Sequence, residues 1–303
     1  MIDLQMEIAG INFQNPVLTA SGTFGYGVEF DSILDLNRLG GIVVKGISAR
    51  PIEGNPPPRL VPTASGMLNS VGLQNIGARQ FIETKLPFLR TLRARTIVNV
   101  FGTTVEDYLE CLHLLNEADG IAAYELNISC PNTSRGGAEF SSDPKLAHEV
   151  VSSAKRAARR PLWVKLSPNV GDIREIALAV VDAGADALTM TNTFLGVSID
   201  ADKGKARIPR VVAGLSGPAI KPLVLRLVYQ TAKVVSVPII AAGGITRAED
   251  ALEFFMAGAS AIEVGTANFY DPEATIKIIR GIEAHCLQRK IQGLKQLVRS
   301  LRV

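Results

Sequence analysis

The amino-acid sequence predicts an α/β fold, a closed (β/α)8 barrel in which residues 1–303 form a single domain. Eight short apolar or β-branched segments recur along the chain, and most are nearly continuous apolar runs, as expected of parallel strands covered on both faces. Segments with helical periodicity separate them, and 303 residues is a suitable length for one such barrel. The expected strands span residues 16–22, 41–48, 96–102, 122–130, 162–168, 187–193, 238–245 and 261–267.

The predicted helices have recognisable first turns. Asp143-Pro144 and Asp271-Pro272 each offer a capping side chain followed by proline at the first helical position. Residues 246–249, with the sequence Thr-Arg-Ala-Glu, are typical of a capping box, and Asp172 precedes a further helix. These signals alternate with the strands, so they support a repeated βα unit.

Three segments do not belong to the repeated units. Residues 6–15 resemble a small N-terminal hairpin with Gly10 near its turn, placed to close the bottom of the barrel. Residues 50–74 and 193–217 are long connections, and we expect them to lie over the C-terminal face of the barrel as functional lids or insertions. The charge run at residues 200–205 is typical of a solvated surface.

Composition limits the possible classes of function. Hydrophobic residues make up 47% and charged residues 20% of the chain, and the net charge is +3, which allows a large core and gives little support to nucleic-acid binding. The three cysteines, at positions 111, 130 and 286, lack the spacing of a disulfide framework or a metal site. We see no secretory signal and no membrane-spanning apolar run, and therefore expect a cytoplasmic protein with no metal, nucleic-acid or membrane partner.

Cys130 is the candidate catalytic residue. It lies in a Ser-Cys-Pro turn just past an expected buried strand, where barrel enzymes keep their chemistry, and a thiol there can transfer a proton. The alternative is a small buried hydrophobic residue, because free cysteine is among the most buried residue types.

Glycines follow the seventh and eighth expected strands, and they indicate a phosphate site. Barrels often bind phosphate there, and glycine lets the backbone approach the anion. Ser216-Gly217 would add to this site. The alternative is that the glycines form tight turns and nothing more. The glycines concerned are Gly217, Gly243, Gly244 and Gly265, the last followed by Thr266.

Two lysines, Lys45 and Lys165, stand inside otherwise apolar strands. A buried ammonium is costly unless a charge or an acceptor meets it. A cofactor or substrate anion is the favoured partner, because few carboxylates lie on the strands and Glu125 and Glu263 are the main exceptions. A structural ion pair is the alternative. Asparagines at strand ends suggest a planar ligand that forms hydrogen bonds, although a single buried asparagine is commonly structural. These asparagines are Asn99, Asn127 and Asn192.

These segments resemble the dihydroorotate dehydrogenase family across nearly the whole chain and in the family's order. The matching motifs occupy residues 20–25, 44–46, 69–75, 127–132, 215–218, 243–245 and 264–267. The resemblance implies an FMN-containing barrel that oxidises dihydroorotate to orotate in pyrimidine synthesis, with Cys130 as the base. It implies substrate binding by Lys45, Asn69, Ser70, Val71, Gly72, Leu73, Asn127, Asn192 and Thr193. It implies FMN binding by Ser21, Lys45, Gly46, Asn99, Asn127, Lys165, Thr191, Gly217, Gly243, Gly244, Gly265 and Thr266.

The resemblance also favours one branch of the family. Cys130 resembles the soluble cysteine type rather than the quinone-linked type, which carries a serine as base. The loop at residues 132–137 resembles the NAD-linked branch more than the fumarate-linked one. In that type a partner subunit carries FAD and a 2Fe-2S cluster, and the implied assembly is a homodimer of this chain within a heterotetramer. Two positions depart from the family pattern, Ile76 where proline is expected and Glu263 where an uncharged residue is usual, and Glu263 could pair with a basic residue.

Other functions stay open. A flavin barrel of the dihydropyrimidine dehydrogenase kind would share the FMN site and the cysteine. A phosphate-binding barrel without redox chemistry, such as an aldolase or isomerase, would share the glycines. A binding module without catalysis is the least compatible with so many convergent polar groups.

Overall fold

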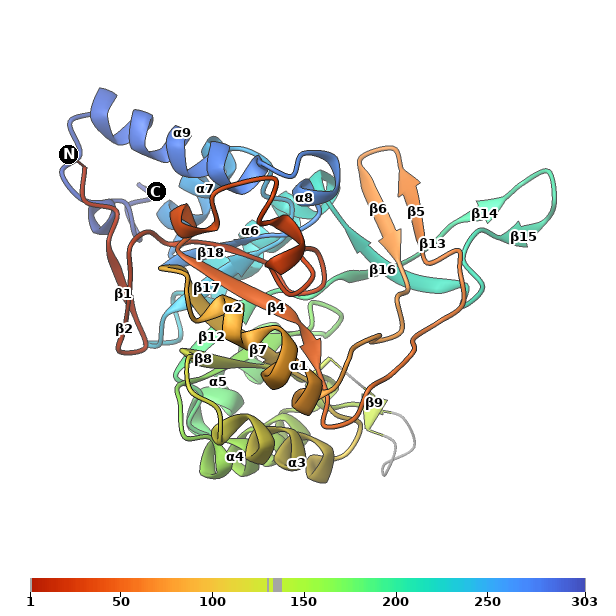
Figure 1. The fold of residues 1–303 in the computed structure, drawn as a ribbon. Helices are drawn as coiled ribbons and strands as arrows, with labels where there is room; N and C mark the ends of the chain where they lie inside the picture. Colours follow the sequence, from red (N-terminus) through yellow and green to blue (C-terminus); the bar gives the residue numbers. More distant parts are fainter. Residues whose placement is uncertain (1, 130, 133–137, 303) are drawn as a thin grey trace.

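The computed structural model describes residues 2–129, 131–132 and 138–302. Its central feature is a closed parallel barrel in which all eight predicted strands take part (Figure 1). In chain order these strands are β3 (Val17–Thr19), β4 (Gly41–Ile47), β7 (Arg95–Val100), β8 (Ala123–Asn127), β11 (Leu162–Leu166), β12 (Ala187–Met190), β17 (Ile239–Ala242) and β18 (Ala261–Val264). Each pairs with its neighbour in sequence, and β18 pairs with β3 to close the ring. The predicted (β/α)8 architecture is therefore confirmed.

Helices surround the barrel and return the chain between strands. They are α1 (Ala78–Thr84), α2 (Leu86–Leu89), α3 (Val105–Asn116), α4 (Pro144–Ala157), α5 (Ile173–Asp182), α6 (Lys221–Thr231), α7 (Ala248–Ala257), α8 (Ala267–Tyr270) and α9 (Ala274–Gln288). Between β3 and β4 the chain makes two short 3-10 turns instead, at residues 28–30 and 36–38, so the first unit departs from the repeated pattern. No helix in the described ranges is both long and apolar enough to cross a bilayer.

The predicted helix starts are confirmed at two sites and shifted at two others. Asp143 caps α4 and Asp172 caps α5 through backbone N–H groups of the first turn. The carboxylate at the start of α7 is Asp250 rather than Glu249, and it accepts from the hydroxyl and N–H of Thr246. Helix α9 begins at Ala274 rather than at Pro272, because Asp271 closes a preceding turn by accepting from the N–H of Ala274.

The N-terminal hairpin closes the barrel bottom as predicted. It consists of β1 (Met6–Ile8) and β2 (Ile11–Phe13), with Gly10 at a positive φ of 77° in the turn. Its buried side chains pack against one inward-facing residue from each barrel strand. That apolar layer consists of Leu18, Val43, Ile97, Ala123, Trp163, Ala187, Ile240 and Ala261. Water is thereby excluded from one end of the barrel, and the opening lies at the other.

The two long connections form a sheet rather than loops. Strands β5 (Leu60–Thr63) and β6 (Gly66–Asn69) come from the first connection, and β13 (Phe194–Val197) and β16 (Val212–Ser216) come from the second. They pair as one antiparallel sheet in the order β13-β16-β6-β5, which projects beyond the C-terminal ends of the barrel strands (Figure 1). The charge run lies in a small extension, β14 (Ile199–Asp200) with β15 (Lys205–Ala206). The predicted position of the two long connections over the C-terminal face is confirmed. Their pairing into one sheet was not predicted.

Candidate active site

A cavity of about 630 Å³ lies between the C-terminal ends of the barrel strands and the antiparallel sheet. Every predicted site residue except Cys130 lines it, and Cys130 lies outside the described residues. The cavity therefore brings together Ser21, Lys45, Gly46, Asn69, Ser70, Val71, Gly72, Leu73, Asn99, Asn127, Lys165, Thr191, Asn192, Thr193, Gly217, Gly243, Gly244, Gly265 and Thr266.

Strand alternation explains why so many polar groups meet here. Side chains on a strand alternate between its two faces, so the residues two positions beyond the apolar bottom layer also point into the barrel. These eight residues form the floor layer, of which all but Glu125 and Thr189 line the cavity: Ala20, Lys45, Asn99, Glu125, Lys165, Thr189, Ala242 and Glu263. The interior thus changes from apolar to polar within one strand period.

Lys165 is at the centre of the floor layer and forms ion pairs with two carboxylates. Its Nζ lies 3.0 Å from Glu263 Oε2 and 3.4 Å from Glu125 Oε1, and it donates to Ser21 Oγ at 3.3 Å. Burial opposes the charged form of Lys165, but the two glutamates outweigh it and raise its pKa to about 12. The structural ion pair, the alternative to a ligand anion, is therefore present, since alternation places all three side chains at one height.

Lys45 differs from Lys165 because the described residues offer it neither a carboxylate nor another hydrogen-bond acceptor at hydrogen-bond distance. Burial lowers its pKa, and the positive charge of Arg59 lowers it further. A half-buried ammonium beside a second cation favours an anion as its partner. The cavity therefore presents one lysine already balanced by protein groups and one that is not.

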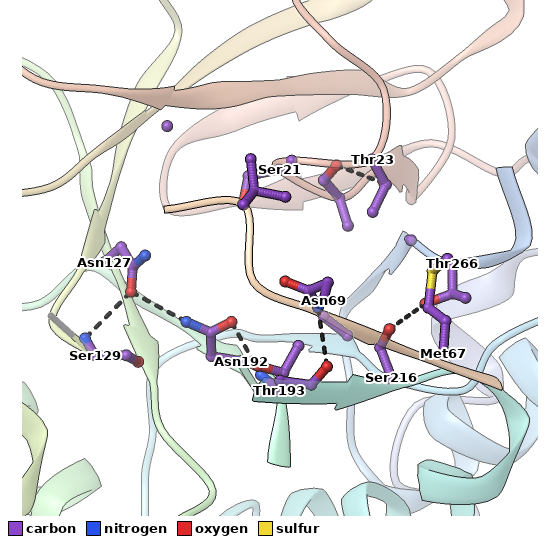
Figure 2. A pocket seen from close by; sticks show the side chains of 18 of the residues that line it. Ser21, Thr23, Met67, Asn69, Asn127, Ser129, Asn192, Thr193, Ser216 and Thr266 are labelled. Atoms are coloured by element: carbon purple, nitrogen blue, oxygen red, sulfur yellow. Dashed lines mark hydrogen bonds between the residues drawn. The ribbon is translucent and has the colours of Figure 1, made fainter. Parts of the chain in front are cut away.

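Three asparagines form a fixed wall of the cavity. Asn127 Oδ1 accepts from the N–H of Ser129 at 3.2 Å and from Asn192 Nδ2 at 3.3 Å, and Asn69 Nδ2 donates to the carbonyl of Gly214 at 3.1 Å (Figure 2). Tyr108 from α3 donates its hydroxyl to the Asn127 carbonyl at 2.7 Å, which fixes the end of β8. Asn127 Nδ2 and Asn69 Oδ1 have no partner among the described residues, so each is available to a ligand.

The loop after β6 presents further backbone to the cavity. Gly72 and Leu73 both have positive φ, 76° and 59°, and Leu73 is a residue that rarely adopts it. Buried Asn75 supports the bend, since its Nδ2 donates to the Leu73 carbonyl at 3.0 Å and its Oδ1 accepts from the N–H of Gly77 at 2.8 Å. Asn55 Nδ2 also donates to the Ser70 carbonyl at 3.0 Å. The loop is thus held in one conformation.

The glycines around the cavity have different reasons for being glycine. Gly217, Gly243 and Gly244 have positive φ, and a Cβ on Gly244 would lie 2.7 Å from the Lys221 backbone. Those positions need glycine for the backbone alone. Gly265 has no positive φ, and the nearest atom to a Cβ built there is Ala20 Cβ at 3.4 Å, an ordinary contact. Space next to Gly265 therefore suits the close approach of a ligand, and Thr266 beside it donates to Ser216 Oγ at 2.8 Å (Figure 2).

Several lining residues escaped the sequence analysis. Asn55, Phe101, Ser129, Asn169 and Arg210 all contact the cavity. Phe101 and Ser129 could have been found, because each lies two positions beyond a predicted inward-facing residue. Asn55, Asn169 and Arg210 lie on loops, where no periodicity shows which way a side chain points.

Comparison with known proteins shows which family this chain resembles. A profile of the family described as dihydroorotate dehydrogenase matches residues 3–286. The chain is 54% identical over 299 residues to a Solibacter usitatus (strain Ellin6076) protein provisionally named dihydroorotate dehydrogenase A (fumarate), covering 99% of this chain and 98% of that one. It is 52% identical to the dihydroorotate dehydrogenase B (NAD(+)) catalytic subunit of Geotalea uraniireducens (strain Rf4), with the same coverage. Its identity to the protein of that name from Alkaliphilus metalliredigens (strain QYMF) is 51%, over 99% of each chain.

Proposed function

Because this chain belongs to the dihydroorotate dehydrogenase family, we propose that it oxidises dihydroorotate to orotate with FMN bound in the cavity at the barrel mouth. The observation that carries the proposal is the gathering of all nineteen predicted site residues in the described part of the chain around one cavity. The family match supports the proposed reaction, and the cavity supports its proposed place at the barrel mouth.

The residues present suit FMN. Open space beside Gly265, next to the hydroxyls of Thr266 and Ser216, suits the phosphate end of the cofactor. Ser21, Gly46, Asn99, Lys165 and Thr191 would hold the ring system, with Gly217, Gly243 and Gly244 shaping the turns beside the phosphate. FMN, when bound, supplies an acceptor for the hydride that leaves C6 of the substrate.

The substrate is a cyclic imide with a carboxylate, and the cavity offers partners for both parts. Lys45 has no carboxylate partner among the described residues and suits the carboxylate of dihydroorotate. Asn127 and Asn69 have a free donor and a free acceptor, which suit the planar N–H and C=O edge of the ring. Asn192 and Thr193 support Asn127 and complete that wall. The loop at residues 69–73, which is already held in one conformation, would lie over the substrate.

Cys130 is the proposed base. It follows Asn127 by three residues, just beyond the end of β8, where its thiolate would remove the proton from C5 of dihydroorotate. Loss of that proton and of the C6 hydride leaves the C5–C6 double bond of orotate. A free thiol has a pKa of about 8.5, so a minority is thiolate at neutral pH and the rate should rise with pH.

NAD is the proposed final acceptor, reached through a partner subunit. Two of the relatives above are named as catalytic subunits of an NAD(+) enzyme, which is a name for one part of an assembly. The proposed partner carries FAD and a 2Fe-2S cluster, and the proposed assembly is a homodimer of this chain within a heterotetramer. Fumarate is the second candidate acceptor, since one relative carries that name at comparable identity.

The test has two parts, both made on protein purified with its bound flavin. Dihydroorotate and dihydrouracil are each added without oxygen, and flavin absorbance is followed. Bleaching of the flavin by dihydroorotate but not by dihydrouracil supports the proposal. Bleaching by dihydrouracil indicates a dihydropyrimidine dehydrogenase. Protein that purifies colourless and takes up no added FMN indicates a non-redox barrel. NAD or fumarate is then offered to the reduced protein, with and without the copurified partner. Oxidation by NAD that requires the partner supports the NAD-linked type.

A further inference from the structure

The floor of the cavity holds an unbalanced set of charged groups. Glu125 and Glu263 share one ammonium, that of Lys165, and all three side chains are buried, with exposures of 0%, 0% and 6%. If all three were ionised, this cluster of three would carry one net negative charge away from water, because Lys45, the other ammonium of the floor layer, forms no ion pair with either glutamate. An uncompensated buried charge costs several kcal/mol, and such a group commonly takes up a proton instead.

The hydrogen bonds differ between the two glutamates. Glu125 is fully satisfied as a carboxylate, since Oε1 accepts from Asn99 Nδ2 at 2.6 Å and Oε2 accepts from Thr189 Oγ1 at 2.7 Å, in addition to the contact with Lys165. Glu263 accepts from Lys165 at 3.0 Å through Oε2, and its buried Oε1 has no partner among the described residues. An extra proton therefore costs least on Glu263.

Few other charges act on this group. Among the described inward-facing barrel residues, Glu125, Lys165 and Lys45 are the titratable side chains besides Glu263 itself. Burial raises the pKa of Glu263 well above its ordinary value, the charge of Glu125 raises it further, and Lys165 acts in the opposite direction. Burial works against ionised Glu125 as well, but Lys165 and the hydrogen bonds from Thr189 and Asn99 outweigh it and lower its pKa.

We propose that Glu263 is a neutral carboxylic acid at neutral pH, so that the buried cluster of Glu125, Lys165 and Glu263 carries zero net charge. Either glutamate can supply the single negative charge that balances Lys165. Glu263 thus acts on the charge of the cluster through its contact with Lys165. Its consequence for flavin rests on the function proposed above: a cluster with zero charge opposes a negatively charged reduced flavin less than a negative cluster does.

Carbon-13 NMR of the flavin-containing protein, labelled at the glutamate carboxyl carbon, tests the protonation directly. At pH 7 we expect one signal at the position of a neutral carboxyl group, absent from Glu263→Gln. The signal should also vanish in Glu125→Gln, because Glu263 would then ionise to balance Lys165. Glutamate signals that all titrate as ordinary carboxylates in the wild type would overturn the proposal, as would a neutral signal that persists in Glu263→Gln. This measurement is informative even if the chain does not oxidise dihydroorotate.

The midpoint potential of the bound flavin tests the charge balance. Each single variant leaves one carboxylate for Lys165, so we expect Glu263→Gln and Glu125→Gln to keep the wild-type potential. The double variant leaves Lys165 unbalanced and should raise the potential, since a positive cluster favours the reduced flavin. A rise in Glu263→Gln of about half that in the double variant would mean that Glu263 is ionised in the wild type, because the two variants would then remove one and two negative charges. An unchanged potential in the double variant would overturn the link to the flavin.

Discussion

The role of a single residue in the barrel interior depends on its position along its strand, because that position decides which interior layer the side chain joins. Trp163 and Ile97 belong to the apolar bottom layer, and Lys165 and Asn99, two positions further on, belong to the polar floor. The same alternation brings Glu125 and Glu263 to Lys165 from strands that are distant in sequence. A lysine that is costly in an apolar strand thus becomes acceptable because its partners occupy the same layer.

Replacement of Cys130 by serine tests the proposed base. Cys130→Ser should retain orotate binding yet reduce flavin at a rate lower by about 10²- to 10⁴-fold near neutral pH, the usual contribution of a positioned base. Stopped-flow absorbance measures this rate. Cys286→Ala is the matched control, because Cys286 is a buried free thiol away from the cavity. Unchanged flavin reduction in Cys130→Ser would refute the assignment.

Two glycines allow ligand approach to be separated from backbone strain. Gly265→Ala should weaken FMN binding by about tenfold or more, equivalent to about 1.4 kcal/mol, and leave the stability of flavin-free protein nearly unchanged. Gly244→Ala should destabilise the flavin-free protein by about 1–3 kcal/mol, because its φ is +73° and its Cβ would meet the Lys221 backbone. FMN titration and urea unfolding measure the two effects. Equal loss of stability in both variants would contradict the distinction.

At this scale much of the site could be predicted from sequence, since polar residues in apolar strands are conspicuous and the family motifs supply their roles. The partners of Lys165 were harder to identify. Glu125 and Glu263 were visible in the sequence, but their meeting depends on the relative heights of three strands. Counting two residues per layer from an apolar bottom layer could have found it.

At the scale of elements, the antiparallel sheet β13-β16-β6-β5 determines how the site is closed. Its two hairpins come from connections more than a hundred residues apart, and the hydrogen bond from Asn69 to Gly214 joins them. A small apolar cluster, Val61, Leu68, Ile208 and Ala213, packs them together. The sequence indicated two long connections over the barrel mouth. It could not indicate the sheet, because pairing between distant short strands leaves no local pattern.

Weakening that cluster should affect the substrate more than the cofactor. Leu68→Ala removes a buried side chain at a cost of about 2–5 kcal/mol, and the sheet that carries Asn69 would loosen. We expect KM for dihydroorotate to rise by about tenfold with a smaller change in FMN affinity. Val197→Ala on the exposed part of β13 is the control and should change neither. A Leu68→Ala protein with normal KM would show that the sheet does not position the substrate.

At the scale of the whole molecule, the buried charges link stability to pH. The pKa of Glu125 lies below its ordinary value of 4.5, so the stability that its pairing contributes is fully present above pH 4.5. That stability is lost as the pH falls from 4.5 through the lowered pKa. Lys165 has a raised pKa of about 12, so its contribution is present below 10.5 and is lost as the pH rises through 12. The pair of Glu125 and Lys165 therefore stabilises the barrel most between these limits, whereas Glu263, with its raised pKa, makes folding less favourable as the pH rises above 4.5.

Removal of the central lysine tests this dependence. Lys165→Met should destabilise flavin-free protein by about 3–5 kcal/mol at pH 8, because it leaves a buried carboxylate uncompensated. The difference from wild type should shrink at pH 5, as Glu125 can then take up a proton. Urea unfolding at both pH values measures it. Lys45 has no carboxylate partner in the described part of the chain, so Lys45→Met should leave the free energy of unfolding unchanged or raise it. A loss of stability as large as that of Lys165→Met would contradict the account.

The barrel and its C-terminal cavity follow from apolar strands, βα alternation and strand-end polar residues, all of which are local features of the sequence. The first unit, with 3-10 turns in place of a helix, shows where the repeat gives way to tertiary packing. The single domain over residues 1–303 and the cytoplasmic location stay predictions.

The central claim is that one cavity holds FMN, the substrate and the thiol together. A crystal structure of the protein with FMN and orotate tests it most directly. The account predicts flavin phosphate beside Gly265, the ring system above Lys165, and orotate between that ring and Cys130 Sγ. A flavin bound elsewhere, or a Cys130 thiol packed into the interior away from orotate, would contradict it.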